Sequence, residues 1–353
     1  MIAGMTGDGV KRWVRRTARV LLALLGVVAL VAAAALVALS AEYAGTPSAS
    51  ARGTGHDAEW LGHAWVDGRK TQSDVDALVA QVRTTGIRDL FVHTGPFNDD
   101  GTLDPGLRPQ GRWFVEAVHQ ALPGVRVQAW LGAHPVPGEL DLRSASTQAN
   151  LLGSATRVLD DGFDGIHYDF EPVVDGDADL LTVLGQAHEL TRRRGAVLSV
   201  SAIHTEPWPG MAAAVTALPT SLALWSADYL AKVAHEVDQV ALMSYDTSLP
   251  SEAAYGGYVR RVTEAALRAV PAEVTLFIGV PAYHDEHPFH HRDAETVAAA
   301  LRGIRLAMGD QPLTREFGVA AYVDFAATTA DWAAYQEGWA APEPEGCGPS
   351  CRR

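Results

Sequence analysis

The chain has 353 residues, of which 48% are hydrophobic and 20% are charged. This composition is typical of a globular protein with a large core and excludes disordered and fibrous chains. The formal net charge of −14 excludes the strongly basic surface that binds nucleic acid. The length permits two average domains, but α/β barrels use roughly 250 residues as one domain, and we favour a single domain.

The amino-terminal region has a basic segment, residues 1–19, followed by an uncharged apolar run from Val20 to Leu39. About 20 apolar residues can span a bilayer as a helix, and a basic flank stays on the cytoplasmic side. We therefore predict a single-pass membrane anchor over residues 20–40, with the remainder outside the cytoplasm. A secretory signal cleaved near Ala38-Leu39-Ser40 is the alternative, and it would give a secreted protein.

Three further regions follow the anchor. Residues 41–56 are rich in Ala, Gly, Ser and Thr, which predicts a flexible linker, and the folded domain is expected over residues 57–341. The tail, residues 342–353, holds the two cysteines of the chain, Cys347 and Cys351. A local disulfide and incidental thiols are both compatible with this spacing, and neither cysteine is assigned a catalytic role.

Short apolar or β-branched runs alternate with helical patterns along the predicted domain. Helical patterns that end at Gly or Pro include residues 113–122, 151–160, 180–194 and 259–270. Eight such strand–helix units are typical of a parallel sheet and predict a closed (β/α)8 TIM barrel. The eight expected strands are residues 60–66, 87–93, 125–131, 165–170, 197–203, 239–245, 274–280 and 317–323.

The fourth run contains His167, Asp169 and Glu171 at alternate positions. Side chains alternate along a strand, so all three are expected to point into the barrel, whose active site lies at the carboxyl ends of the strands. Two neighbouring carboxyl groups resist joint ionisation, so one stays protonated near neutral pH and can act as a general acid. Glu171 is the predicted catalytic acid.

The segment from Phe163 to Glu171 resembles the DxxDxDxE signature of glycoside hydrolase family 18, with His167 in place of the middle aspartate. The segment Met243-Ser244-Tyr245-Asp246 is similar to the M-x-Y-D segment on the sixth strand of that family. The resemblance covers residues 60–339. It implies a chitinase-like TIM barrel that binds or hydrolyses glycans containing 2-acetamido sugars.

The resemblance further implies a retaining mechanism in which the 2-acetamido group of the sugar replaces an enzyme nucleophile. Glu171 would protonate the leaving oxygen, Asp169 would hold the acetamido N–H, and Tyr245 would hydrogen-bond the acetamido carbonyl. No metal or cofactor is expected. The residues expected to contact or support the substrate site are Asp164, His167, Asp246, Met243, Tyr322, Trp130 and Tyr283.

Two alternatives remain open at this level. Replacement of the middle aspartate by His167 is compatible with a glycan-binding barrel that has lost turnover; protonated, this histidine would clamp Asp169 in an ion pair and suppress activity in acid. A metal-dependent barrel hydrolase is the second alternative. It rests on histidines near strand ends, namely His63, His93, His134, His167, His204 and His284.

Two other groups of residues carry weaker signals. The cluster at residues 284–291 is expected to be a solvated loop, with metal binding as a minor option. Tryptophans near strand ends could stack on sugar rings, although core packing is the default for each. These tryptophans are Trp65, Trp130, Trp208 and Trp225.

Overall fold

The computed structural model describes residues 7–217, 223–310 and 313–340, so the predicted tail with Cys347 and Cys351 lies outside the described residues. Eight parallel strands pair in sequence order and form a closed barrel, which β8 completes by pairing with β1. This confirms the predicted TIM barrel. The strands are β1 (Asp57–Leu61), β2 (Ile87–His93), β3 (Arg126–Ala133), β4 (Gly165–Phe170), β5 (Val197–Ala202), β6 (Gln239–Leu242), β7 (Thr275–Pro281) and β8 (Phe317–Tyr322).

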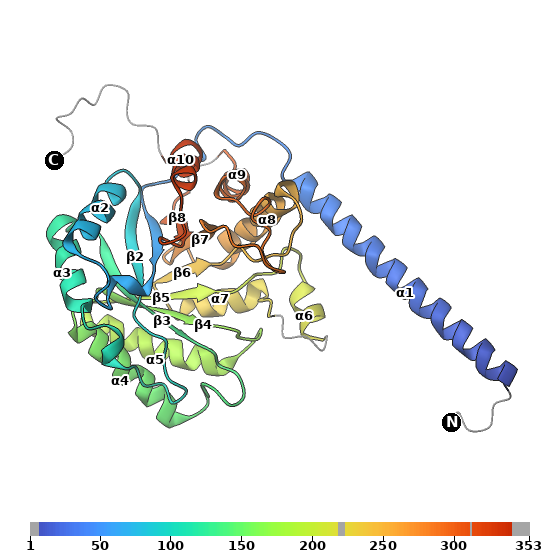
Figure 1. The fold of residues 1–353 in the computed structure, drawn as a ribbon, viewed down its shortest axis with the longest axis horizontal. Helices are drawn as coiled ribbons and strands as arrows, with labels where there is room; N and C mark the ends of the chain where they lie inside the picture. The colour runs from blue at the N-terminus through green and yellow to red at the C-terminus, as the bar shows by residue number, and fades with distance from the viewer. Residues whose placement is uncertain (1–6, 218–222, 311–312, 341–353) are drawn as a thin grey trace.

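Helices surround the barrel, and α1 projects away from it (Figure 1). Polar caps and left-handed glycines set their ends: in α5, Asp177 accepts the N–H groups of Asp179 and Leu180, and Gly195 has φ 65°. The helices are α1 (Gly7–Glu42), α2 (Gln72–Val82), α3 (Gly111–Ala121), α4 (Ala145–Asp160), α5 (Ala178–Arg194), α6 (Met211–Thr216), α7 (Ala227–His235), α8 (Glu252–Ala269), α9 (Val297–Met308) and α10 (Thr329–Gly338).

The first strand begins three residues earlier than predicted, and residues 63–65 form a 3-10 turn instead of continuing it. Asp57 and Glu59 are buried in β1, but charged residues are typical of loops, so the sequence pattern did not include them in the strand. Asp57 accepts a hydrogen bond from the Trp339 indole at 2.9 Å, and Glu59 accepts one from Gln81 at 3.1 Å. The shift moves Trp60 toward the carboxyl end of the strand.

Helix α1 is continuous through the predicted anchor, and its segment Arg15–Glu42 contains an 18-residue window with a mean hydropathy of 3.0, long and apolar enough for a candidate membrane span. Its carboxyl end packs on α8, where Leu39 is buried. Gly256 and Gly257 allow this close approach, because a Cβ on Gly257 would overlap the Leu39 backbone and one on Gly256 would overlap the Tyr43 ring. The end of the helix is therefore docked on the barrel.

The segment that follows α1, predicted as a flexible linker, runs along α9. The Arg302 guanidinium donates to the Gly45 carbonyl at 2.6 Å, and the Arg305 guanidinium donates to the Ala51 carbonyl at 2.7 Å. Ala51 is buried. These contacts fix the path of the chain between the helix and the first strand.

The barrel interior is filled below the level of the site. Asp89 accepts hydrogen bonds from Arg126 and Gln128, each at 2.7 Å, near the amino ends of the strands. Above them lie the fully buried rings of Phe91 and Phe277. This packing leaves only the carboxyl ends of the strands open to a ligand.

Candidate active site

A cavity of about 1150 Å³ lies at the carboxyl ends of the strands. It brings together residues that the sequence analysis selected from three strands and residues that it did not select. The selected residues that line it are Asp169, Glu171, Met243, Tyr245, Asp246 and Tyr322.

Asp169 lies near the end of β4 with its carboxylate partly buried. The Trp130 indole N–H donates to Asp169 Oδ2 at 2.7 Å, and Oδ1 has no hydrogen-bond partner among the described residues. Burial raises the pKa of Asp169, and the hydrogen bond from Trp130 opposes that rise. Trp130 itself is absent from the cavity lining and contacts the site through its hydrogen bond to Asp169.

Glu171 follows β4 directly and shares its inward face with Asp169. The pKa of Glu171 is raised to about 8. Burial is the largest cause, and the charges of Asp169 and Asp246 contribute to the same rise. This raised pKa favours the protonated carboxyl group at neutral pH. Burial raises the pKa values of both Asp169 and Glu171, and the division of protons between these two carboxyl groups stays a prediction.

Tyr245 follows β6 and stacks on Tyr322 from the end of β8, with ring centroids 5.0 Å apart and an interplanar angle of 18°. Burial raises the pKa of Tyr245 well above its usual value, and the nearby carboxyl groups Glu171 and Asp169 add to this. The phenol therefore stays protonated and can donate a hydrogen bond into the cavity. Met243 lies on the same wall.

Asp246 has a left-handed backbone with φ 59°, and its carboxylate is half-buried. The Tyr283 hydroxyl donates to Asp246 Oδ1 at 2.5 Å. Tyr283 is not a lining residue, so it positions Asp246 from behind. The predicted solvated loop 284–291 is solvated only in part, because His290 is fully buried and packs on the Tyr283 ring.

His167 lies beneath the cavity, not in its wall. It is fully buried and stacked on Phe91, with centroids 3.9 Å apart. Trp60 donates to Nε2 at 3.0 Å, which leaves Nδ1 as the donor to Ser199 at 2.7 Å. Burial lowers the pKa of His167 to about 3. The expected contact with substrate and the protonated clamp on Asp169 are therefore wrong, and both ring nitrogens are occupied by protein groups rather than free to bind a metal.

Asp164 lies at the opposite end of β4 from the cavity. Its Oδ2 accepts the Val127 N–H at 2.7 Å and contacts His119 Nε2 at 2.8 Å. It ties β4 to β3 and α3. This position corrects its inclusion among substrate-contacting residues and fits the supporting role that the family resemblance implies.

The sequence analysis missed Trp60 and Ser201 as lining residues. Trp60 was missed because the predicted β1 began at this residue, far from the carboxyl end of the strand. Ser199 and Ser201 alternate on β5, and this pattern could have predicted that Ser201 points into the barrel. His134 and His204, noted only as possible metal ligands, also line the cavity.

The tryptophans divide between cavity and core. Trp208 lines the cavity, with the Arg261 guanidinium 5.7 Å from its ring. Trp65 and Trp225 are buried, and each donates its indole N–H to another part of the barrel.

One wall of the cavity comes from α1. Ala32, Ala35, Leu36 and Leu39 line it together with the exposed Phe289 from the loop after β7. The apolar helix and the acidic residues of β4 therefore border the same space.

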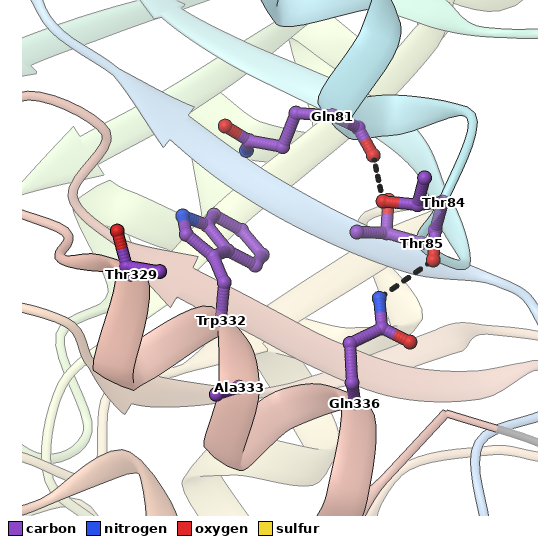
Figure 2. A pocket seen from close by; sticks show the side chains of 7 residues that line it. All are labelled: Gln81, Thr84, Thr85, Thr329, Trp332, Ala333 and Gln336. Carbon is purple, nitrogen blue, oxygen red and sulfur yellow. Dashed lines mark hydrogen bonds between the residues drawn. The ribbon is translucent and has the colours of Figure 1, made fainter.

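A second hollow, of about 230 Å³, lies between α2 and α10 on the outside of the barrel (Figure 2). Its walls carry amides, hydroxyls and the Trp332 ring but no ionisable side chain, and the Gln336 amide crosses it to the Thr84 carbonyl at 2.6 Å. It offers no acid–base chemistry.

Comparison with known proteins identifies the fold. No protein-family profile and no curated protein sequence matches the chain. The spore cortex-lytic enzyme SleL of Bacillus megaterium matches with a TM-score of 0.58 at 14% identity, over 84% of this chain and 77% of that one. A chitinase of Chromobacterium violaceum matches with a TM-score of 0.54 at 15% identity, over 80% and 98%. A class V chitinase of Pseudomonas fluorescens matches with 0.51 at 13%, over 80% and 98%. The chain thus shares the barrel of chitinase-like glycosidases.

Proposed function

We propose that the chain is a membrane-tethered glycoside hydrolase that cleaves glycans containing 2-acetamido sugars. The observation that carries this proposal is that Asp169, Glu171 and Tyr245 line one cavity, where burial and nearby charges raise the pKa of Glu171 to about 8. A carboxylic acid, a carboxylate and a neutral hydrogen-bond donor are the groups that a substrate-assisted cleavage requires. The shared fold with chitinases supports the same reaction class.

In this mechanism Glu171 donates its proton to the leaving glycosidic oxygen. The free Oδ1 of Asp169 accepts the acetamido N–H, and Tyr245 donates to the acetamido carbonyl, so the carbonyl oxygen is held beneath the anomeric carbon. That oxygen forms a bond to the anomeric carbon as the glycosidic bond breaks. Water then attacks the anomeric carbon, the bond from this carbon to the acetamido oxygen breaks, and the ionised Glu171 accepts the proton of the water.

We place the reaction at the surface of the membrane that faces away from the cytoplasm. Cleavage of a signal near Ser40 would remove Leu39, which is packed on α8 and lines the cavity. The docked helix therefore favours an anchor over a cleaved signal. It also favours a glycan held close to the membrane surface, since α1 forms one wall of the site.

The test is hydrolysis of an N-acetylglucosamine oligomer, whose leaving sugar needs protonation, by the wild type and by Glu171→Gln. The amide keeps the shape but has no transferable proton, so kcat should fall by about 10²–10⁴-fold while binding of the oligomer is retained. Glu189→Gln, an exposed change on α5, is the matched control and should behave as the wild type.

The corresponding glucose oligomer, which has a 2-hydroxyl group, should not be cleaved because it cannot supply the acetamido oxygen. Wild-type rates in Glu171→Gln would exclude the mechanism. Binding of the oligomer without cleavage by the wild type would instead identify a glycan-binding barrel.

A further inference from the structure

The loop between β7 and α9, residues 282–296, buries two ionisable side chains behind Asp246. The side chains of His290 and Glu295 have no solvent exposure. Glu295 Oε1 accepts the Thr247 backbone N–H at 3.0 Å and the Thr247 hydroxyl at 2.9 Å, which fixes the carboxylate. Tyr283 stacks on His290 with ring centroids 4.2 Å apart and fixes the imidazole.

The remaining polar atoms of this cluster lack hydrogen-bond partners within the described residues. Glu295 Oε2 and His290 Nδ1 are both buried and unpaired. Nδ1 lies 3.4 Å from Glu295 Oε2 and 3.5 Å from Asp246 Oδ1, longer than the roughly 2.7–3.2 Å of an N–H···O hydrogen bond. Unpaired buried polar groups are costly, so the arrangement calls for an additional partner.

The separations fit a metal ion. Zinc bound tetrahedrally at about 2.0–2.2 Å places its ligand atoms roughly 3.3–3.6 Å apart. His290 Nδ1 lies at this spacing from one oxygen each of Asp246 and Glu295, and all three ligand atoms lie within 4.8 Å of one another. His287 Nε2, at 3.6 Å from Asp246 Oδ1, is a further imidazole within reach.

We propose that Asp246, His290 and Glu295 bind a divalent cation of the zinc class, with His287 or water as the fourth ligand. The ion would join the loop after β7 to the end of β6 and hold the Asp246 carboxylate, which lines the cavity. It would position this wall of the site from outside and would not contact the reacting bond. The proposal does not depend on the reaction proposed above.

The experiment measures metal binding by the purified full-length chain in detergent. After equilibration with Zn²⁺ and removal of excess, metal analysis should find this site filled in the wild type, and Co²⁺ should give the visible absorption of a four-coordinate ion. Glu295→Gln should lose one equivalent of zinc and this absorption. Loss of a group that only orients a metal ligand weakens metal binding roughly 10–100-fold, so loss of a direct carboxylate ligand in Asp246→Asn should weaken zinc binding by at least that factor.

The matched control lies in the same loop: Glu286 is exposed, and its carboxylate contacts His291 at 3.0 Å, which is not one of the proposed ligands. Glu286→Gln should bind zinc as the wild type does. Because Asp246 is half-buried, Asp246→Asn serves as the test if Glu295→Gln does not fold. Equal zinc content in all variants would mean adventitious binding and would overturn the proposal, as would no retained zinc in the wild type.

Discussion

Asp169 and Glu171 lie two residues apart on one face of β4, and burial raises the pKa of each, but they have different neighbours. Asp169 receives the Trp130 N–H, which stabilises its ionised form. Glu171 is buried and lies near the negative charges of Asp169 and Asp246, and both effects stabilise its protonated form. His167, two residues earlier, is kept neutral by burial below Trp60 and contributes to packing instead of catalysis.

The pH dependence of the reaction should report Glu171. A proton donor works only while protonated, so with a pKa of about 8 the rate should hold at neutral pH and fall as the pH rises through 8. The measurement is kcat against pH on an alkyl glycoside. An aryl glycoside whose leaving group needs little protonation should show a weaker alkaline fall, and an alkaline fall centred near pH 5 on both substrates would contradict the assignment.

Trp130 should act through Asp169. Trp130→Phe keeps the ring but removes the hydrogen bond to Oδ2, and loss of a hydrogen bond to a charged group costs about 1.5–3 kcal/mol. We expect kcat to fall roughly 10–100-fold with a smaller change in KM. Trp332→Phe in the outer hollow (Figure 2) is the control and should leave kcat unchanged. Equal effects of Trp130→Phe and Trp332→Phe on kcat would mean that Trp130 contributes only to packing.

At the scale of elements, the contact between α1 and α8 depends on two adjacent glycines. Alanine is the better helix former by about 1 kcal/mol, so Gly→Ala within a helix ordinarily stabilises it. At Gly257 the added Cβ would overlap the Leu39 backbone, and main chain cannot move aside as a flexible side chain can. Steric overlap should therefore outweigh helix propensity at this position.

Gly257→Ala should lower the free energy of unfolding by about 1–3 kcal/mol and loosen the end of α1. Thermal unfolding of the full-length protein in detergent measures the first effect, and protease sensitivity of residues 43–53 measures the second. Gly153→Ala on α4, where the new Cβ meets only the end of Arg157 at 3.7 Å, should be neutral or stabilising. Equal stability of the Gly257 variant and the wild type would show that α1 does not dock as described.

At the scale of the whole molecule, the candidate membrane span α1 forms part of the wall of the cavity. Residues of α1 from Ala32 to Leu39 border the barrel on the side of the cavity. A membrane around α1 would therefore lie near the mouth of the cavity.

The full-length protein should fractionate with membranes, and protease added to intact cells should digest the barrel, because the basic flank of the span stays in the cytoplasm. A cytoplasmic protein of known location serves as the control for cell integrity. Protection of the barrel until lysis would reverse the proposed orientation, and release of the barrel into the medium would identify a cleaved signal.

Local patterns in the sequence determined the barrel, strand β4 and the pairing of Asp169 with Glu171, because strand alternation depends only on neighbouring residues. Only the tertiary structure determined the start of β1, where buried Asp57 is bonded to Trp339, 282 positions away. The same holds for the neutral, buried His167 and for the wall that α1 gives the cavity. In each case the environment of a side chain comes from elements distant in sequence, whose contacts no local pattern records.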